Sequence, residues 1–136
     1  MPVLIDKDVA IHIRDGEPTT SERLARLGQA PVISAITLAE LRGGAAADAK
    51  RASLLAEFLR FVPVLPFADA EARAYGDIVA QLRHDRHRVL DRMIAAQAIV
   101  SGLRLVTMNG RDFRKVPGLV LEEWPSPTPR PSGAPR

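Results

Sequence analysis

Short apolar segments alternate with amphipathic segments along most of the chain, and this alternation restricts the possible folds more than any other feature. Short runs of apolar residues predict strands at residues 3–5, 31–34, 62–67, 103–107 and 119–121. Apolar residues spaced three and four apart predict helices at about 9–13, 20–28, 37–41, 48–61, 69–83 and 93–100. Strands that alternate with helices in this way favour an α/β fold, with a parallel sheet covered by helices on both faces.

Local capping signals predict the ends of two of these helices. The spacing of Thr19 and Glu22 is that of a capping box, which predicts that a helix begins there and continues to about Gly28. A second helix is expected to start at Thr37 and to end at the adjacent glycines 43 and 44.

The length of the chain, 136 residues, suits one hydrophobic core. We therefore expect a single domain over residues 1–124. Residues 125–136 contain five prolines and no apolar stripe, which predicts a disordered C-terminal tail. A run of about 18 apolar residues, the length that spans a bilayer, does not occur, so we expect a cytoplasmic protein without a membrane segment.

The composition excludes several kinds of active site. The chain has no cysteine, so it can form neither a disulfide nor a thiolate metal site, and it has no cysteine nucleophile. Its three histidines, His12, His84 and His87, are scattered and give no Ser–His–Asp arrangement. Any metal would therefore be held mainly by carboxylate oxygens, which suit Mg²⁺ or Mn²⁺. The net charge of +3, mostly from arginine, permits a nucleic-acid partner without demonstrating one.

Four acidic residues fall at ends of predicted strands or near the starts of predicted helices. Asp6 follows the first strand, Glu40 lies in the helix after the second, Asp91 precedes an apolar helix, and Asp112 lies in the turn after 103–107. Binding sites of parallel α/β sheets lie at the carboxyl ends of the strands. We therefore expect these four side chains to converge at one edge of the sheet.

Each of these acids also has a simpler, local interpretation. Asp6 or the nearby Asp8 could cap the following helix, and Asp91 could cap the apolar helix after it. Glu40 stands three residues after Thr37, so it could complete a capping box there. Asp112 could close the turn that contains Asn109 and Gly110.

The four acids together are more informative than each one alone. Carboxylates brought close together repel one another, which raises their pKa values unless a cation neutralises them, so such a cluster usually binds a divalent metal. A bound metal would lower the pKa of a water molecule and orient it toward a phosphodiester. This chemistry needs no side-chain nucleophile.

Four motifs resemble those of the PIN-domain toxins of the VapC type, and the resemblance spans residues 3–124. They lie at residues 3–9, 36–44, 91–98 and 102–113. By this resemblance Asp6, Glu40, Asp91 and Asp112 are the metal-binding and catalytic residues. Thr107 and Asn109 would be polar supports beside them, and Asp8 would be a possible additional ligand.

The resemblance implies a three-layer α/β/α sandwich of the PIN type with a short central, mainly parallel sheet. It further implies an endoribonuclease dependent on Mg²⁺ or Mn²⁺ that acts as the toxin of a toxin–antitoxin pair. Its partners would be RNA, a second copy of the chain in a homodimer, and a VapB-type antitoxin that blocks the acidic site. DNA would be contacted only through the antitoxin.

Two segments depart from the family pattern. Lys7 and Asp8 stand where the family commonly has Thr and Asn, and Lys7 would either contact the substrate or point to solvent. Residues 84–88 read His-Asp-Arg-His-Arg, where the family more often has glycine and proline. This basic loop would either follow the phosphates of an RNA or form a solvated turn.

Alternative functions remain at this point. The Asp-Lys-Asp sequence at residues 6–8 has the form of the nucleophile motif of haloacid-dehalogenase-type phosphatases, but residues 105–110 do not supply that family's later Gly-Asp motif. A receiver domain is a weaker candidate, because no acid follows Val64 and Leu65. A catalytically silent PIN module is the third alternative, and the presence of all four acids argues against it.

Overall fold

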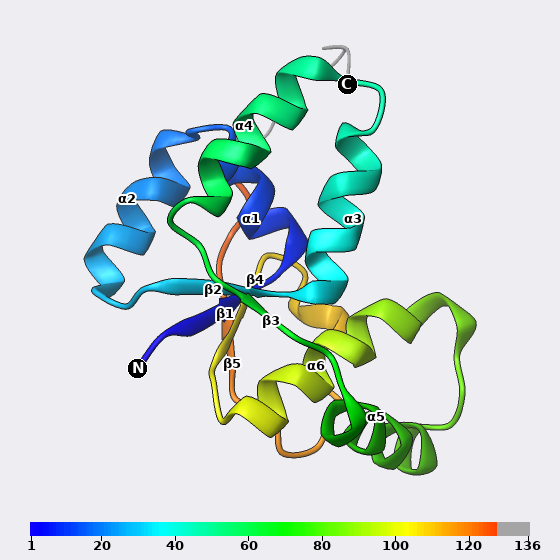
Figure 1. Cartoon of the computed structure of the whole chain (residues 1–136). Coiled ribbons are helices and arrows are strands. Elements are labelled where there is room, and N and C mark those ends of the chain that lie inside the picture. The colour runs from blue at the N-terminus through cyan, green and yellow to red at the C-terminus, as the bar shows by residue number, and fades with distance from the viewer. Residues whose placement is uncertain (128–136) are drawn as a thin grey trace, which may run out of the picture.

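A parallel sheet forms the centre of the molecule (Figure 1). The computed structural model of the protein describes residues 1–127, and its sheet within them has five strands. In chain order these are β1 (Val3–Ile5), β2 (Pro31–Ser34), β3 (Val64–Leu65), β4 (Leu105–Thr107) and β5 (Leu121–Glu123). Their order across the sheet is β3-β2-β1-β4-β5, and every neighbouring pair is parallel. The predicted parallel α/β sheet is confirmed.

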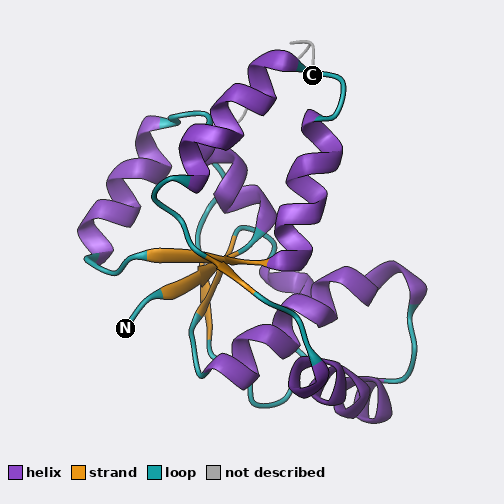
Figure 2. Ribbon diagram, in the orientation of Figure 1, coloured by secondary structure: helices purple, strands orange, loops and turns teal. Residues whose placement is uncertain are grey.

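Helices cover both faces of the sheet (Figure 2). Four pack on one face: α1 (Lys7–Arg14), α2 (Pro18–Leu27), α3 (Ala35–Ala45) and α4 (Ala49–Leu59). Two pack on the other: α5 (Asp69–Leu82) and α6 (Val89–Ser101). Two short 3-10 turns, η1 (Arg86–Arg88) and η2 (Gly110–Asp112), precede α6 and follow β4. This is the three-layer α/β/α sandwich that the sequence predicted.

The alternation of side chains along each strand explains why the strands are apolar throughout. In β1, Val3 and Ile5 belong to the core under α1–α4, whereas Leu4 belongs to the core under α5 and α6. Successive side chains of a strand point to opposite faces, so a strand covered on both sides buries every residue. All three residues of β1 are fully buried.

Two predicted helix boundaries were wrong. Helix α2 begins at Pro18, and its N-cap is Glu17, whose carboxylate accepts hydrogen bonds from the backbone N–H groups of Thr19 and Thr20 at 2.9 and 2.7 Å. The capping box from Thr19 does not form, because Pro18, whose φ is already helical, occupies the first turn of the helix.

Helix α3 is longer than predicted at both ends. It begins at Ala35, where the hydroxyl of Ser34 accepts the N–H of Ile36 at 3.0 Å, and it runs through both glycines to Ala45. A glycine inside a helix costs only about 1 kcal/mol relative to alanine. The burial of Leu41 and Ala45 against the core offsets this cost.

The topology determines where a site can form. From β1 the chain proceeds to β2 and β3 on one side and later returns to β4 and β5 on the other, so the order reverses between β1 and β4. Helix α6 leads directly into β4, which places the start of α6 at the carboxyl edge of the sheet. Ligands of open α/β sheets bind at such a reversal point.

Two predictions concern the ends of the chain and membranes. Most of the proline-rich segment, residues 128–136, lies outside the described residues, so its predicted disorder stays a prediction. Among the residues that the structure describes, no helix is both long and apolar enough to cross a bilayer.

Candidate active site

Asp6 lies between β1 and α1 and is almost completely buried. One carboxylate oxygen accepts the backbone N–H of Lys7 at 2.6 Å, and the other accepts the hydroxyl of Thr107 at 2.8 Å. The local interpretation of Asp6 as the N-cap of α1 is therefore confirmed. Burial raises the pKa of Asp6 above its ordinary value; the hydrogen bonds from Thr107 and Lys7 oppose this, while the charges of Asp8 and Glu40 add to it.

Asp91 lies in the first turn of α6 and not at its cap. The helix begins two residues earlier, at Val89, so the N-cap interpretation of Asp91 was wrong. Burial, followed by the negative charges of Asp6, Asp112 and Glu40, raises the pKa of Asp91 to about 6. The three other predicted acids are thus close enough to disfavour a charge on this carboxylate, as the sequence prediction of a cluster requires.

Glu40 reaches the same edge from the second turn of α3. Because α3 starts at Ala35, Glu40 is too far into the helix for the predicted capping box with Thr37. Its carboxylate instead lies 3.4 Å from the ammonium nitrogen of Lys7. Lys7 therefore lies against one of the four acids, although 42% of its side chain is exposed, and its contact with the substrate stays a prediction.

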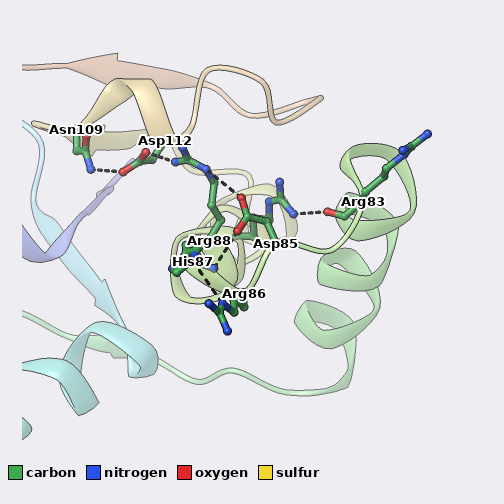
Figure 3. A network of polar contacts seen from close by, with 8 residues as sticks. Arg83, Asp85, Arg86, His87, Arg88, Asn109 and Asp112 are labelled. Carbon is green, nitrogen blue, oxygen red and sulfur yellow. Dashed lines mark hydrogen bonds and ion pairs between the residues drawn. The ribbon is translucent and has the colours of Figure 1, made fainter.

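Asp112 lies in η2, just beyond β4. One of its oxygens accepts a hydrogen bond from the guanidinium of Arg88, and the other accepts one from the side-chain amide of Asn109 (Figure 3). Arg88 belongs to the basic loop 84–88, so the fold brings this unusual loop directly against the fourth acid.

Thr107 and Asn109 link the first acid to the fourth. Thr107 is fully buried, and its hydroxyl donates to Asp6 while accepting the backbone N–H of Asn109 at 2.9 Å. The side chain of Asn109 then donates to Asp112. A continuous series of hydrogen bonds therefore runs from Asp6 through Thr107 and Asn109 to Asp112. Asp8 is exposed on α1 and lies outside this series, although its charge acts on Asp6.

Comparison with known proteins identifies the family of the chain. The model of the PIN-domain family matches residues 3–119. The chain belongs to the PIN-domain family. Within that family it is of the VapC type, as its sequence motifs predicted. Nothing in the comparisons supports the phosphatase alternative.

Curated relatives and solved structures similar to this PIN domain are VapC nucleases and their complexes. It is 32% identical over 127 residues to the tRNA(fMet)-specific endonuclease VapC of Shigella flexneri, covering 89% of this chain and 96% of that protein. It is 34% identical to ribonuclease VapC1 of Rickettsia felis, covering 88% of this chain and 93% of that protein. The crystal structure of Rickettsia felis VapBC2 bound to a promoter DNA fragment has a chain similar in fold, with a TM-score of 0.80 and 26% identity. That likeness covers 91% of this chain and 99% of the other.

The four acids of this PIN domain have the right chemistry to bind a divalent metal, but their side chains are not arranged around a common point. PIN-domain ribonucleases generally depend on a divalent metal. The four acids offer only oxygen ligands. Burial first, and neighbouring carboxylates after it, raise the pKa values of Asp6 and Asp91, so a cation would stabilise their ionised forms. Within residues 1–127, however, no three acidic or histidine side chains are placed so that they could hold an ion together. Glu40 and Asp112 are instead paired with Lys7 and Arg88.

The sequence does not predict Lys7 and Arg88 as partners of the acids. Lys7 stands out in it only as a departure from the family pattern, and Arg88 only as part of a basic loop. Arg88 also lies 3.7 Å from the carboxylate of Asp85, three positions earlier in the chain. No local pattern could have predicted the pairs of Lys7 with Glu40 and of Arg88 with Asp112, because these residues are far apart in the sequence.

Proposed function

We propose that this PIN domain is an endoribonuclease dependent on Mg²⁺ or Mn²⁺ and the toxin of a toxin–antitoxin pair. The observation that carries the proposal is that the charges of Asp6, Asp112 and Glu40 all act on Asp91, at the edge of the sheet where the strand order reverses. The similarity to VapC ribonucleases over nearly their whole length supports the same activity.

The four acids are proposed as the metal-binding and catalytic residues. Asp6 and Asp91 would hold the ion first, because burial and neighbouring negative charge already disfavour their ionised forms. Glu40 and Asp112 would join them by leaving Lys7 and Arg88. A bound divalent ion would supply a water of lowered pKa and would stabilise charge on the attacked phosphate.

The supporting residues keep these acids in position. Thr107 and the backbone N–H of Lys7 fix both oxygens of Asp6, so this carboxylate cannot turn away from the site. Asn109 orients Asp112 in the same way. When the acids bind a metal, the ammonium group of Lys7 and the guanidinium group of Arg88 become free to face phosphate oxygens.

The partners are proposed from the relatives. Solved structures similar to this chain include toxin–antitoxin complexes and VapBC complexes bound to DNA. We therefore propose a VapB-type antitoxin as the partner, contact with DNA only through it, a homodimer of the toxin and a cytoplasmic location. A basic antitoxin side chain would compete with the metal for the carboxylates, because both are attracted to the same negative charge.

A cleavage assay tests the proposed activity. Purified wild type, Asp6→Asn and Asp77→Asn would be incubated with a mixed small-RNA pool in Mg²⁺ or Mn²⁺, with EDTA as a further control, and the cut ends sequenced. Asp77 is exposed on α5. The variant Asp77→Asn is therefore a control that makes the same change of charge away from the proposed active site. Discrete cuts that persist in Asp77→Asn but disappear in Asp6→Asn and in EDTA are the expected result.

The other outcomes distinguish the alternatives. Hydrolysis of a phosphomonoester without RNA cleavage in either metal would favour the phosphatase. RNA binding without cleavage by the wild type would favour a catalytically silent PIN module. Cleavage that survives Asp6→Asn would contradict the assignment of the site.

A further inference from the structure

A cavity of about 460 Å³ lies beside the acidic residues. It is bounded by the basic loop, the start of α6 and the segment after β4. Asp112 links the cavity to the proposed active site, because it is one of the four acids and also lines the cavity. The charged residues that line it are Asp85, Arg88, Arg92, Arg111, Asp112 and Lys115. We call this cavity the basic pocket.

Both carboxylates of the basic pocket are paired with the same arginine of the pocket. Arg88 donates to Asp112, and its guanidinium also lies 3.7 Å from the carboxylate of Asp85 (Figure 3). Asp85 further accepts the backbone N–H of His87 at 2.9 Å. Two carboxylates therefore share one arginine, and the remaining cations of the pocket are left without an acidic partner inside it.

Arg92 forms a fixed part of the wall. Only 7% of it is exposed, and its guanidinium donates to the backbone carbonyl of Arg83, the residue that ends α5. This contact holds the end of α5 against α6 and keeps a positive charge at the base of the pocket. Because Arg92 contributes to the fold as well as to the pocket, replacing it would not separate a loss of binding from a loss of structure.

Arg111 and Lys115 are the free cations of the pocket. Both side chains are exposed, and neither lies within 4.0 Å of a carboxylate among residues 1–127. The neighbouring Arg114 differs from them, since it pairs with Glu123 at 2.6 Å although it adjoins Lys115 in sequence. The pocket thus presents two unpaired cations next to a residue of the proposed active site.

We propose that the basic pocket binds a backbone phosphate of the RNA, adjacent to the phosphate that is cut. This inference rests on the proposed function. An RNA that places one phosphate at the acidic cluster extends away from it in both directions, and the basic pocket adjoins the cluster because Asp112 is common to both. Phosphate oxygens suit guanidinium and ammonium donors, and such contacts position a strand without reading its sequence.

The pocket is expected to act on affinity more than on chemistry. Arg111 and Lys115 would hold the strand equally before and during cleavage, and such uniform binding alters KM while leaving kcat unchanged. Removing both should therefore raise KM, with kcat and the positions of the cuts preserved.

Binding in the absence of cleavage gives the direct test. A fluorescein-labelled single-stranded RNA 20-mer of mixed sequence would be titrated in EDTA with wild type, with the double variant Arg111→Ala/Lys115→Ala, and with Lys50→Ala/Arg51→Ala. The last removes the same charge from α4, outside the pocket. Anisotropy would be measured over a series of KCl concentrations, with circular dichroism to verify the fold of each variant.

The expected size of the effect follows from counterion release. Each phosphate neutralised on a single strand contributes about 0.7 to the slope of log affinity against log salt, so losing the one phosphate held by Arg111 and Lys115 should lower the slope by about 0.7. At 0.1 M salt this corresponds to binding that is about 5-fold weaker. The variant on α4 should keep the slope of the wild type.

Three results would overturn the proposal, each in a different way. An unchanged slope and affinity in Arg111→Ala/Lys115→Ala, while wild type still cleaves RNA, would remove the pocket alone. An equal loss in the variant on α4 would mean that only total charge matters. Wild type that neither binds nor cleaves RNA would remove the proposed function as well. A Glu-rich peptide serves as a second probe: if it loses affinity in the pocket variant while RNA does not, the occupant is an acidic protein segment.

Discussion

The substitution Asp91→Asn should stabilise this PIN domain in the absence of metal. Asparagine has the shape of aspartate but carries no charge, so it removes the repulsion from Asp6, Asp112 and Glu40 without opening a cavity. It also removes the cost of burying a charge at the start of α6, which is the largest cause of the raised pKa of Asp91. A residue kept for function often lowers stability in this way.

The magnitude follows from the shift of the pKa. Folding raises the pKa of Asp91 from 3.8 to about 6, and each unit corresponds to about 1.4 kcal/mol, which gives an upper bound of about 3 kcal/mol. The side chain remains in partial contact with solvent, which screens the repulsion, so we expect a gain of about 1–2 kcal/mol at pH 7.5.

The size of the effect depends on pH over a defined range. Because the pKa of Asp91 is higher in the folded state, the folded protein holds the proton more tightly, and wild type loses stability as the pH rises from about 4 to about 6. The asparagine variant has no such titration. The difference between the two proteins should therefore nearly vanish at pH 4 and reach its full value above pH 6.

Urea unfolding at several pH values measures this difference. Trp124 is the single tryptophan of the chain and is 6% exposed, so its fluorescence reports the loss of the core. The titrations would be made in EDTA and then in Mg²⁺. A metal at 100 times its dissociation constant adds about 2.7 kcal/mol, so Mg²⁺ should stabilise wild type and have much less effect on the variant.

Two results would refute this reasoning. A variant less stable than wild type at pH 7.5 in EDTA would mean that Asp91 makes a favourable contact in the folded protein. A difference that does not change between pH 4 and pH 7 would mean that its carboxyl group is not perturbed.

The remaining predictions concern the support of Asp6 and the core. Thr107→Val removes the hydroxyl that donates to buried Asp6, so the free energy of unfolding in urea should fall by about 1–3 kcal/mol; an unchanged value would show that the bond contributes nothing. Phe58→Ala, in the core under α4, should lower it by about 3–5 kcal/mol. Phe61→Ala is the matched control, because Phe61 is 71% exposed, and its effect should stay within about 0.5 kcal/mol.

Sequence patterns with one physical cause gave correct predictions of the fold. The strands were predictable because a strand buried on both faces must be apolar at every position, as Val3, Leu4 and Ile5 are. The approach of Asp6 to Asp91 was predictable because parallel strands all end at one edge, and a helix leading into β4 must begin there.

Helix ends were less predictable because several residues near each end could cap it. Glu17 caps α2 where Thr19 was predicted, and Ser34 caps α3 where Thr37 was predicted. Each candidate offers an oxygen at a plausible spacing, and the packing of the helix on the sheet decides which one is used. The position of Glu40 in the second turn of α3 followed from this choice.

By itself the sequence determined the layers, the parallel sheet and the edge at which the acids meet, because these depend on local periodicity and on the direction of the chain. Only the tertiary structure decided the charges that face those acids. Lys7 reaches Glu40, Arg88 reaches Asp112, and Thr107 reaches Asp6 across 101 positions of sequence. Such contacts depend on how α1, α3 and the loop before α6 pack on the sheet. Local sequence patterns do not predict that packing.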